Sequence, residues 1–100
     1  MVKRNKEDSN KKSALLKLLG KTIATQREKE KLTQAQLAEI SKLDTTTIWR
    51  IENGHLNSKI YNIFQILIAL RMESLDLTKF KEILEKNGDD INDWTAKKNI

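Results

Sequence analysis

Apolar residues recur three and four positions apart through most of this 100-residue chain, and only three Gly and no Pro interrupt the pattern. This spacing places apolar side chains on one face of an α-helix. Sandwiches and barrels of many short strands need frequent turns, so the scarcity of Gly and Pro, with 5% aromatic residues, argues against them. The sequence therefore predicts an all-α fold with a single core.

Composition also argues against several classes of protein. Without Cys the chain has no disulfide, thiol nucleophile or thiolate metal site, which fits a reducing compartment such as the cytoplasm. The longest apolar run, Ile66–Leu70, is far shorter than the roughly 18 residues of a membrane span. One His and no cofactor-binding loop disfavour an enzyme, and we expect neither a cofactor nor a bound metal.

The net charge of +5 is unevenly distributed. Residues 1–31 hold ten Lys or Arg against four acidic residues, residues 32–60 hold three of each, and residues 61–100 hold six against seven. A basic surface attracts polyanions such as nucleic acids. A solvated Lys-rich surface explains the same counts, so charge alone decides nothing.

The chain divides into three predicted parts. Residues 1–12 have almost no apolar residues and are expected to form a flexible basic arm. Residues 13–77 form the main domain, whose first helix is capped by Ser13 and ends near Lys31. Residues 78–100 supply a C-terminal helix and an acidic, Trp-containing tail.

Capping signals divide the main domain into further helices. Thr33 and Gln36 form a capping box at the start of a helix over 34–41. Asp44 caps a helix over 45–53 that Gly54 ends with a left-handed residue. The last two elements are a helix capped by Ser58 that runs to about Met72, and a segment over 74–86 that is either a fifth helix or a short strand at 74–77 leading into one.

The two short helices at 34–41 and 45–53 are the feature most informative about function. They are joined by about three residues, and two helices joined in this way cross steeply, so that the second projects from the domain. A projecting helix fits the major groove of B-DNA, where each base pair presents a distinct pattern of donors and acceptors. The pair predicts a domain that binds double-stranded DNA.

The outward side of the second helix supplies the predicted base contacts. Arg50 can donate two hydrogen bonds to guanine, although a surface ion pair is the plainer alternative. Trp49 can press on a thymine methyl group or instead fold back onto the turn at Asp44. The predicted base-reading residues are Thr45, Thr46, Trp49 and Arg50.

Polar residues around these helices are candidates for phosphate contacts, through side chains and through the amides at a helix start. An ordinary polar loop explains the composition of 53–59 almost as well. A metal site at His55 has no second imidazole or thiolate to complete it. The predicted phosphate-binding residues are Gln34, Thr47, Asn53, His55, Asn57 and Lys59.

Two segments carry a resemblance to a known family: Leu32–Glu39, which reads LTQAQLAE, and Thr47–Gly54, which reads TIWRIENG. With Leu19–Gly20 and Arg27 upstream, the chain from Leu19 to Leu75 resembles the lambda-repressor-like or Cro-type helix-turn-helix regulators of the XRE family. The resemblance implies a compact five-helix domain that regulates transcription, with 45–53 as its recognition helix. It also implies a structural ion pair between Arg27 and Glu52.

The sequence departs from the family pattern at two positions. Lys42 occupies a turn position that usually holds glycine, so a non-glycine residue must adopt a left-handed backbone there, at a cost of roughly 1–2 kcal/mol, or the turn is built differently. Arg71 stands where a glycine often ends the fourth helix, which leaves the end of that helix open.

The fourth helix is apolar on more than one side, and such a helix is normally buried on more than one side. Either the 74–86 segment covers it or a second copy of the chain does, and we expect a symmetric homodimer on a palindromic operator. The predicted dimer or partner contacts are Ile66, Ile68, Met72 and Trp94.

Three functions agree with these observations. The first is a sequence-specific DNA-binding regulator, expected to be an autoregulating repressor. The second is a DNA-binding antitoxin that also neutralises a toxin protein through the acidic segment around Trp94, although that Trp can equally pack on its own domain. The third is a protein-interaction module that does not read DNA, which the neutral charge of 32–60 supports.

Overall fold

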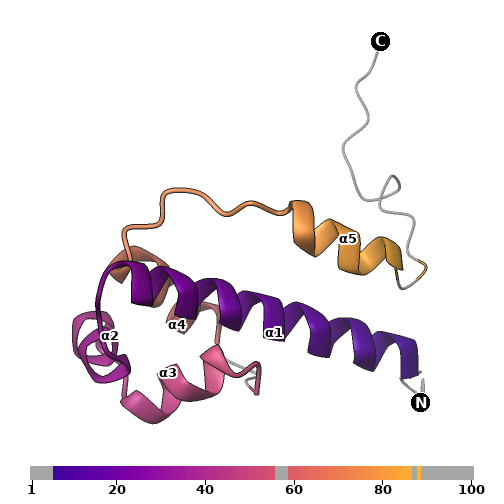
Figure 1. Cartoon of the computed structure of the whole chain (residues 1–100). Coiled ribbons are helices and arrows are strands. Elements are labelled where there is room, and N and C mark those ends of the chain that lie inside the picture. Colours follow the sequence, from indigo (N-terminus) through magenta and orange to yellow (C-terminus); the bar gives the residue numbers. More distant parts are fainter. Residues whose placement is uncertain (1–5, 56–58, 87, 89–100) are drawn as a thin grey trace.

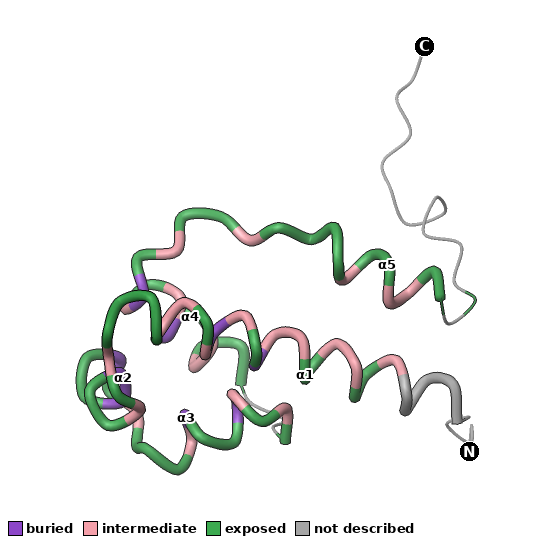
Figure 2. The backbone as a smooth tube through the Cα atoms, viewed as in Figure 1, coloured by how far each residue is buried: buried purple, intermediate pink, exposed green. Residues whose placement is uncertain are grey.

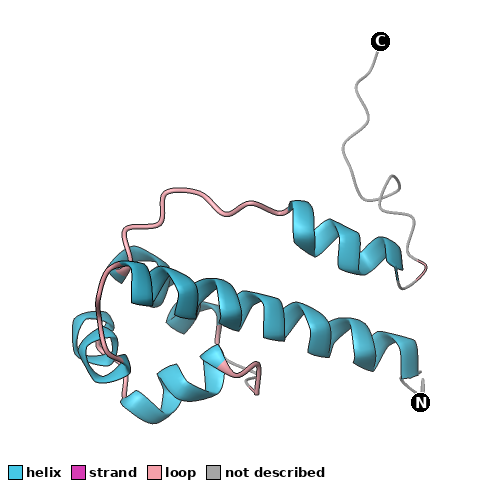
Figure 3. Ribbon diagram, in the orientation of Figure 1, coloured by secondary structure: helices cyan, strands magenta, loops and turns pink. Residues whose placement is uncertain are grey.

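The computed structural model describes residues 6–55, 59–86 and 88, and within them it contains five helices and no strand (Figure 1 and Figure 3). The helices are α1 Lys6–Lys29, α2 Gln34–Ser41, α3 Thr45–Glu52, α4 Ile60–Ala69 and α5 Thr78–Lys86. The predicted all-α fold with five helices is confirmed. In this described part, no helix combines the length and the apolar character that a membrane crossing requires.

The long helix α1 organises the arrangement, because α3 and α5 pack against it on opposite sides, as Figure 1 shows. The short helices α2 and α3 pack on each other, and α4 packs against α2. Their apolar faces meet in one small core (purple in Figure 2). Its fully buried side chains are Ile23, Leu37, Ile48, Ile66 and Leu70.

Helices α1 and α3 approach so closely that their crossing has no room for a side chain at Gly20. A Cβ atom there would collide with the carbonyl groups of Ile51 and Glu52, and it would lie 2.8 Å from the carbonyl carbon of Glu52. Gly54, which has a left-handed φ of 71°, is tight for a related reason, since its Cβ would lie 2.9 Å from the Cα of Lys17. The end of α3 therefore lies directly on the backbone of α1.

Both departures from the family pattern have left-handed backbones. Lys42 has φ 64° and ψ 32°, and Arg71 has φ 58°. After each of them the next residue donates its amide five residues back, from Leu43 to Ala38 and from Met72 to Leu67. The chain thus keeps the glycine-type turn without glycine, and α4 ends at Ala69 instead of running to Met72 as expected.

Other predicted boundaries are wrong. The flexible arm predicted over 1–12 is wrong for residues 6–12, which are helical. Residues 1–5 lie outside the described part. Ser13 lies inside α1 and does not cap it. The segment 74–77 is neither strand nor helix, and Asp76 accepts a hydrogen bond from the amide of Thr78 at the start of α5. The residue that precedes α4 is Lys59, with no side-chain cap, and Ser58 lies outside the described residues.

One of the four predicted dimer or partner contacts is wrong, because Ile66 is fully buried in the core of its own chain. Met72 packs partly against that core, and its contact with a partner stays a prediction. Ile68 does face outward, with 75% of its surface exposed, and Trp94 lies outside the described residues. Since α5 packs against α1, the predicted alternative in which 74–86 covers the outer face of α4 is also wrong.

We predict that Gly20→Ala destabilises the protein although alanine is the better helix former. Intrinsic propensity alone would stabilise α1 by about 1 kcal/mol. The new methyl group would instead force α3 away from α1, and such overpacking costs about 1–3 kcal/mol, or more where the neighbour is backbone. Urea denaturation gives the free energy of unfolding of each variant, and Lys21→Ala at the adjacent exposed position is the control. An increase in stability for Gly20→Ala would contradict the close crossing.

Candidate nucleic-acid interface

The helix pair α2 and α3 begins with the predicted capping box. The amide of Gln36 donates to the hydroxyl oxygen of Thr33 at 3.0 Å, and the amide of Thr33 donates to the side-chain oxygen of Gln36 at 2.8 Å. This reciprocal pair satisfies two amides that α2 leaves without helical partners. The start of α2 is therefore fixed locally, before any contact with α3.

The turn between the two helices is held at both ends. The buried hydroxyl of Ser41 donates to the carbonyl of Leu37 at 2.7 Å, next to the left-handed Lys42. At the start of α3, Asp44 accepts a hydrogen bond from the amide of Thr47 at 2.6 Å. Hydrogen bonding to Thr47 lowers the pKa of Asp44 below its usual 3.8, so the charged cap contributes fully above pH 3.8 and is lost only as the pH falls further, through the lowered pKa. The angle of α3 is thus set by satisfied local contacts.

Helix α3 has one buried side and one exposed side. Ile48 and Ile51 are in the core, which fixes the rotation of the helix about its axis. The four predicted base-reading residues, Thr45, Thr46, Trp49 and Arg50, are all exposed. A helix locked by its inner face and open on its outer face can present those side chains to a ligand without rearrangement.

A cluster of hydrogen bonds around Glu52 joins α3 to α1 and α2. Arg27 donates to both carboxylate oxygens of Glu52, from Nε at 2.7 Å and from Nη2 at 3.0 Å, and from Nη1 to the carbonyl of Leu32 at 2.7 Å. Only 13% of the Arg27 side chain and 5% of the Glu52 side chain are exposed. The hydrogen bonds from Arg27 to Glu52 raise the pKa of Arg27, so the guanidinium stays charged. The ion pair implied by the family resemblance is present.

Gln34 takes part in the same cluster, which the sequence did not indicate. Its Nε2 donates to Oε1 of Glu52 at 3.0 Å, so its side chain is half-buried and occupied by the protein. The expected phosphate contact of Gln34 remains a prediction. The side-chain amide has a second N–H, which can donate to a phosphate oxygen while the first donates to Glu52. The two residues are 18 positions apart, so no local pattern in the sequence indicates this contact.

The indole of Trp49 stacks on the imidazole of His55, with ring centroids 5.6 Å apart and an angle of 18° between the ring planes. Trp49 therefore does not fold back onto the turn at Asp44, which was the alternative to a DNA contact. About half of Trp49 remains exposed. This stack is not predicted from the sequence, although His55 directly follows Gly54 at the end of α3.

The remaining predicted phosphate contacts are distributed around the end of α3. The Nδ2 of Asn53 donates to the carbonyl of Trp49 at 2.8 Å, which occupies part of that side chain. The amide of Thr47 is bound by Asp44, and Lys59 is exposed before α4. Asn57 lies outside the described residues. The structure thus gathers Asn53, His55 and the exposed side of α3 at one end of the helix.

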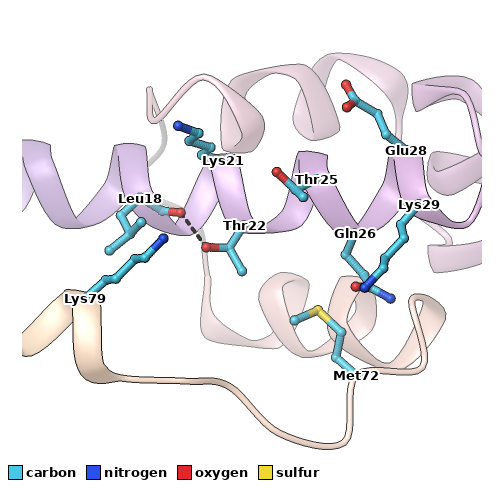
Figure 4. Close-up of a pocket in the computed structure, with 9 residues that line it drawn as sticks. All are labelled: Leu18, Lys21, Thr22, Thr25, Gln26, Glu28, Lys29, Met72 and Lys79. Carbon is cyan, nitrogen blue, oxygen red and sulfur yellow. Dashed lines mark hydrogen bonds between the residues drawn. The ribbon is translucent and has the colours of Figure 1, made fainter.

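A separate cavity of about 790 Å³ lies between α1 and the linker to α5 (Figure 4). The close-up shows Thr22 donating to the carbonyl of Leu18, at 2.8 Å, on the wall formed by α1. None of the predicted DNA-contacting residues lines this space. Met72, a predicted dimer contact, lines this cavity. The remaining lining residues are Lys21, Thr25, Gln26, Glu28, Lys29 and Lys79.

The zero net charge of 32–60 conceals an uneven exposed charge. Of its three acidic residues, Glu39 and Asp44 are exposed, whereas Glu52 is buried and paired with Arg27. Its three basic residues, Lys42, Arg50 and Lys59, are all exposed. Because Arg27 lies outside this range, counting residues by segment understates the positive charge presented to solvent.

Comparison with known proteins gives one clear match. A family model described as helix-turn-helix (HTH_3) matches residues 23–77, just over half of the chain. The match covers α2, α3, α4 and the last turns of α1, and it includes every residue of the Glu52 cluster. No curated protein matches the chain.

We predict that Arg27→Met lowers the free energy of unfolding by about 3–5 kcal/mol, because it leaves the carboxylate of Glu52 buried without its cation. The double variant with Glu52→Leu removes both charges and should be more stable than Arg27→Met alone. Denaturation of the two single variants and the double variant measures this coupling. Glu28→Ala is the control, since that side chain is 71% exposed and only 3.8 Å from Arg27, and it should change stability by less than about 0.5 kcal/mol. Losses that simply add would contradict the coupling.

Proposed function

Because the chain belongs to the HTH_3 family of helix-turn-helix proteins, which are DNA-binding transcription regulators, we propose that it reads specific double-stranded DNA sequences with α3 in the major groove. One observation carries this proposal. Thr45, Thr46, Trp49 and Arg50 are all exposed on a helix whose opposite face, with Ile48 and Ile51, is buried.

The Glu52 cluster supports the proposal because base reading requires a rigid helix. Side chains that discriminate bases must be held within about 0.5 Å of their productive positions. Three hydrogen bonds reach Glu52 from two other helical regions, and they fix the end of α3 that carries Arg50. A mobile recognition helix would lose that accuracy.

The exposed charge also favours DNA over the rival interpretation of an interaction module that does not read DNA. That rival rested on the neutral sum of residues 32–60. Since Glu52 is already neutralised, Arg50 and Lys59 are available for guanine and for phosphate. In this proposal His55, Asn53 and Gln34 contact the DNA backbone near the end of α3. Thr47 contacts it near the start of α3.

For the regulatory outcome we propose repression, including repression of the chain's own promoter. A domain bound in the major groove across a promoter blocks access of polymerase by steric exclusion. One short recognition helix contacts few base pairs, so a symmetric operator with two half-sites about 34 Å apart is the expected target.

We predict that Arg50→Ala weakens binding by about 1–3 kcal/mol and relaxes the preference at one base position, because a bidentate guanine contact is lost. The operator is first selected from a random DNA pool, and the two proteins are then compared on single-base variants of it. Lys81→Ala, at an exposed position of α5, is the control and should leave the base preference unchanged. Weak binding that is blind to sequence and unchanged in Arg50→Ala would favour the interaction module instead.

We predict that Trp49 contacts a thymine methyl group. Replacing thymine by uracil at one operator position should weaken binding of the wild-type protein, and the same replacement should have little effect on Trp49→Ala. The comparison isolates the methyl group, since uracil keeps every hydrogen-bonding atom of thymine. Equal losses for both proteins at every thymine would contradict a methyl contact.

A further inference from the structure

The outer face of α4 is an exposed apolar surface that continues onto α2. Each of its residues is more than half exposed, although all are large and apolar or aromatic. We call this surface the α4 patch. It consists of Ile60, Tyr61, Phe64 and Ile68 of α4 together with Ile40 of α2.

The α4 patch is continuous across the two helices. Ile40 and Ile68 lie on the two walls of one shallow groove of about 480 Å³, with Gln65 and Ala69 beside them. Helix α4 carries no charged residue from Ile60 to Ala69. Lys42 and Arg71 line the same groove, so its apolar side chains lie beside two cations.

No other described helix covers this surface. The opposite face of α4 already supplies Ile66 to the core, and α5 packs against α1. Exposed isoleucines at helical spacing, Ile60 and Ile68, therefore have no intramolecular role in the part of the chain that the structure describes. A second apolar face on a helix is normally buried against a second surface.

The size of the α4 patch agrees with the needs of a dimer. Its five residues leave on the order of 500 Å² of apolar surface uncovered. A standard interface buries about 800 Å² per partner, of which somewhat more than half is apolar. The patch thus matches the apolar share of one side of such an interface.

We propose that the α4 patch is the surface through which two copies of this chain associate. The same apolar surface on both copies can pair under two-fold symmetry, and a helix without charged residues, as α4 is, is typical of interface cores. The inference rests on the proposed function for its purpose, because two copies would read the two half-sites. It goes beyond that function by placing the interface on α4 and Ile40, away from Ile66 and Met72.

The rim of the patch gives the dimer a distinctive salt dependence. Lys42 and Arg71 line the groove between Ile40 and Ile68, so each copy brings two cations to the interface. Salt screens the repulsion between like charges while leaving apolar burial intact. Self-association should therefore hold or strengthen as salt rises, whereas DNA binding should weaken.

The test is sedimentation equilibrium of the full chain without DNA. The wild-type protein should be a dimer at micromolar concentration, and raising the salt from about 0.1 M to about 0.5 M should not dissociate it. Ile68→Asp should weaken self-association at least about tenfold, because it replaces an apolar side chain of the interface with a strongly hydrated carboxylate. Leu77→Asp is the matched control: that leucine is also about half exposed, but it lies in the linker before α5, and its replacement should leave the dimer intact.

Circular dichroism melting checks that each variant is folded. If Ile68→Asp does not fold, Ile60→Asp, at the other end of the patch, provides a second measurement of self-association. Duplexes with one or two half-sites then separate this inference from the proposed function. Ile68→Asp should bind a single half-site as the wild type does and lose at least about tenfold on the paired site.

A monomeric wild-type protein that still reads a half-site would overturn the dimer and leave the DNA-reading proposal standing. A dimer that binds no specific DNA would overturn the DNA-reading proposal and leave the dimer standing. Self-association that is unchanged in both Ile68→Asp and Ile60→Asp, or lost equally in Leu77→Asp, would also overturn the α4 patch as the interface.

Discussion

The buried carboxylate of Glu52 is the constraint on which the arrangement of the other helices depends. A charged group with 5% of its side chain exposed is tolerated only when its oxygens are fully hydrogen-bonded to cations or donors. Arg27 supplies two donors from α1 and Gln34 supplies one from α2. Three helices must therefore meet at one point. The close approach at Gly20, where the α3 backbone lies on α1, follows from the same requirement.

Four helices of this chain end in the same way, and this repetition shapes the site. After α1, α2, α3 and α4, a left-handed residue is followed by one whose amide reaches back five residues. Three of the left-handed residues are cations, Lys31, Lys42 and Arg71, whose charge suits the negative end of a helix dipole and offsets part of their backbone strain of roughly 1–2 kcal/mol each. Among these four turns, glycine is needed only at Gly54, where Lys17 leaves no room for a side chain.

This turn also accounts for the stack between Trp49 and His55. In such turns the residue after the left-handed one commonly packs on the last helical turn, and Leu32, Leu43 and Met72 each pack against the core in that position. At the end of α3 the same position holds His55, and the side chain within its reach is Trp49. The stack is thus the exposed counterpart of a contact that is buried elsewhere in the chain.

Local signals in the sequence were sufficient for the helix pair but not for its surroundings. The capping box at Thr33 and the cap at Asp44 depend on residues three apart, which a sequence displays directly. The helical start of α1 was missed because residues 6–12 carry no apolar stripe, and periodicity detects a helix only through such a stripe. The contact from Gln34 to Glu52 joins positions 18 residues apart, so only the packed structure reveals it.

Helix α4 shows why hydrophobicity alone cannot separate a core from an interface. Both of its faces are apolar, so the pattern does not distinguish Ile66, which is fully buried, from Ile68, which is 75% exposed. The distinction arises from α2, which packs against one face of α4, and from α5, whose place on α1 leaves the other face open. Because the core face is already satisfied within one chain, a change on the outer face can alter association while the support of α3 by Arg27 and Glu52 stays intact.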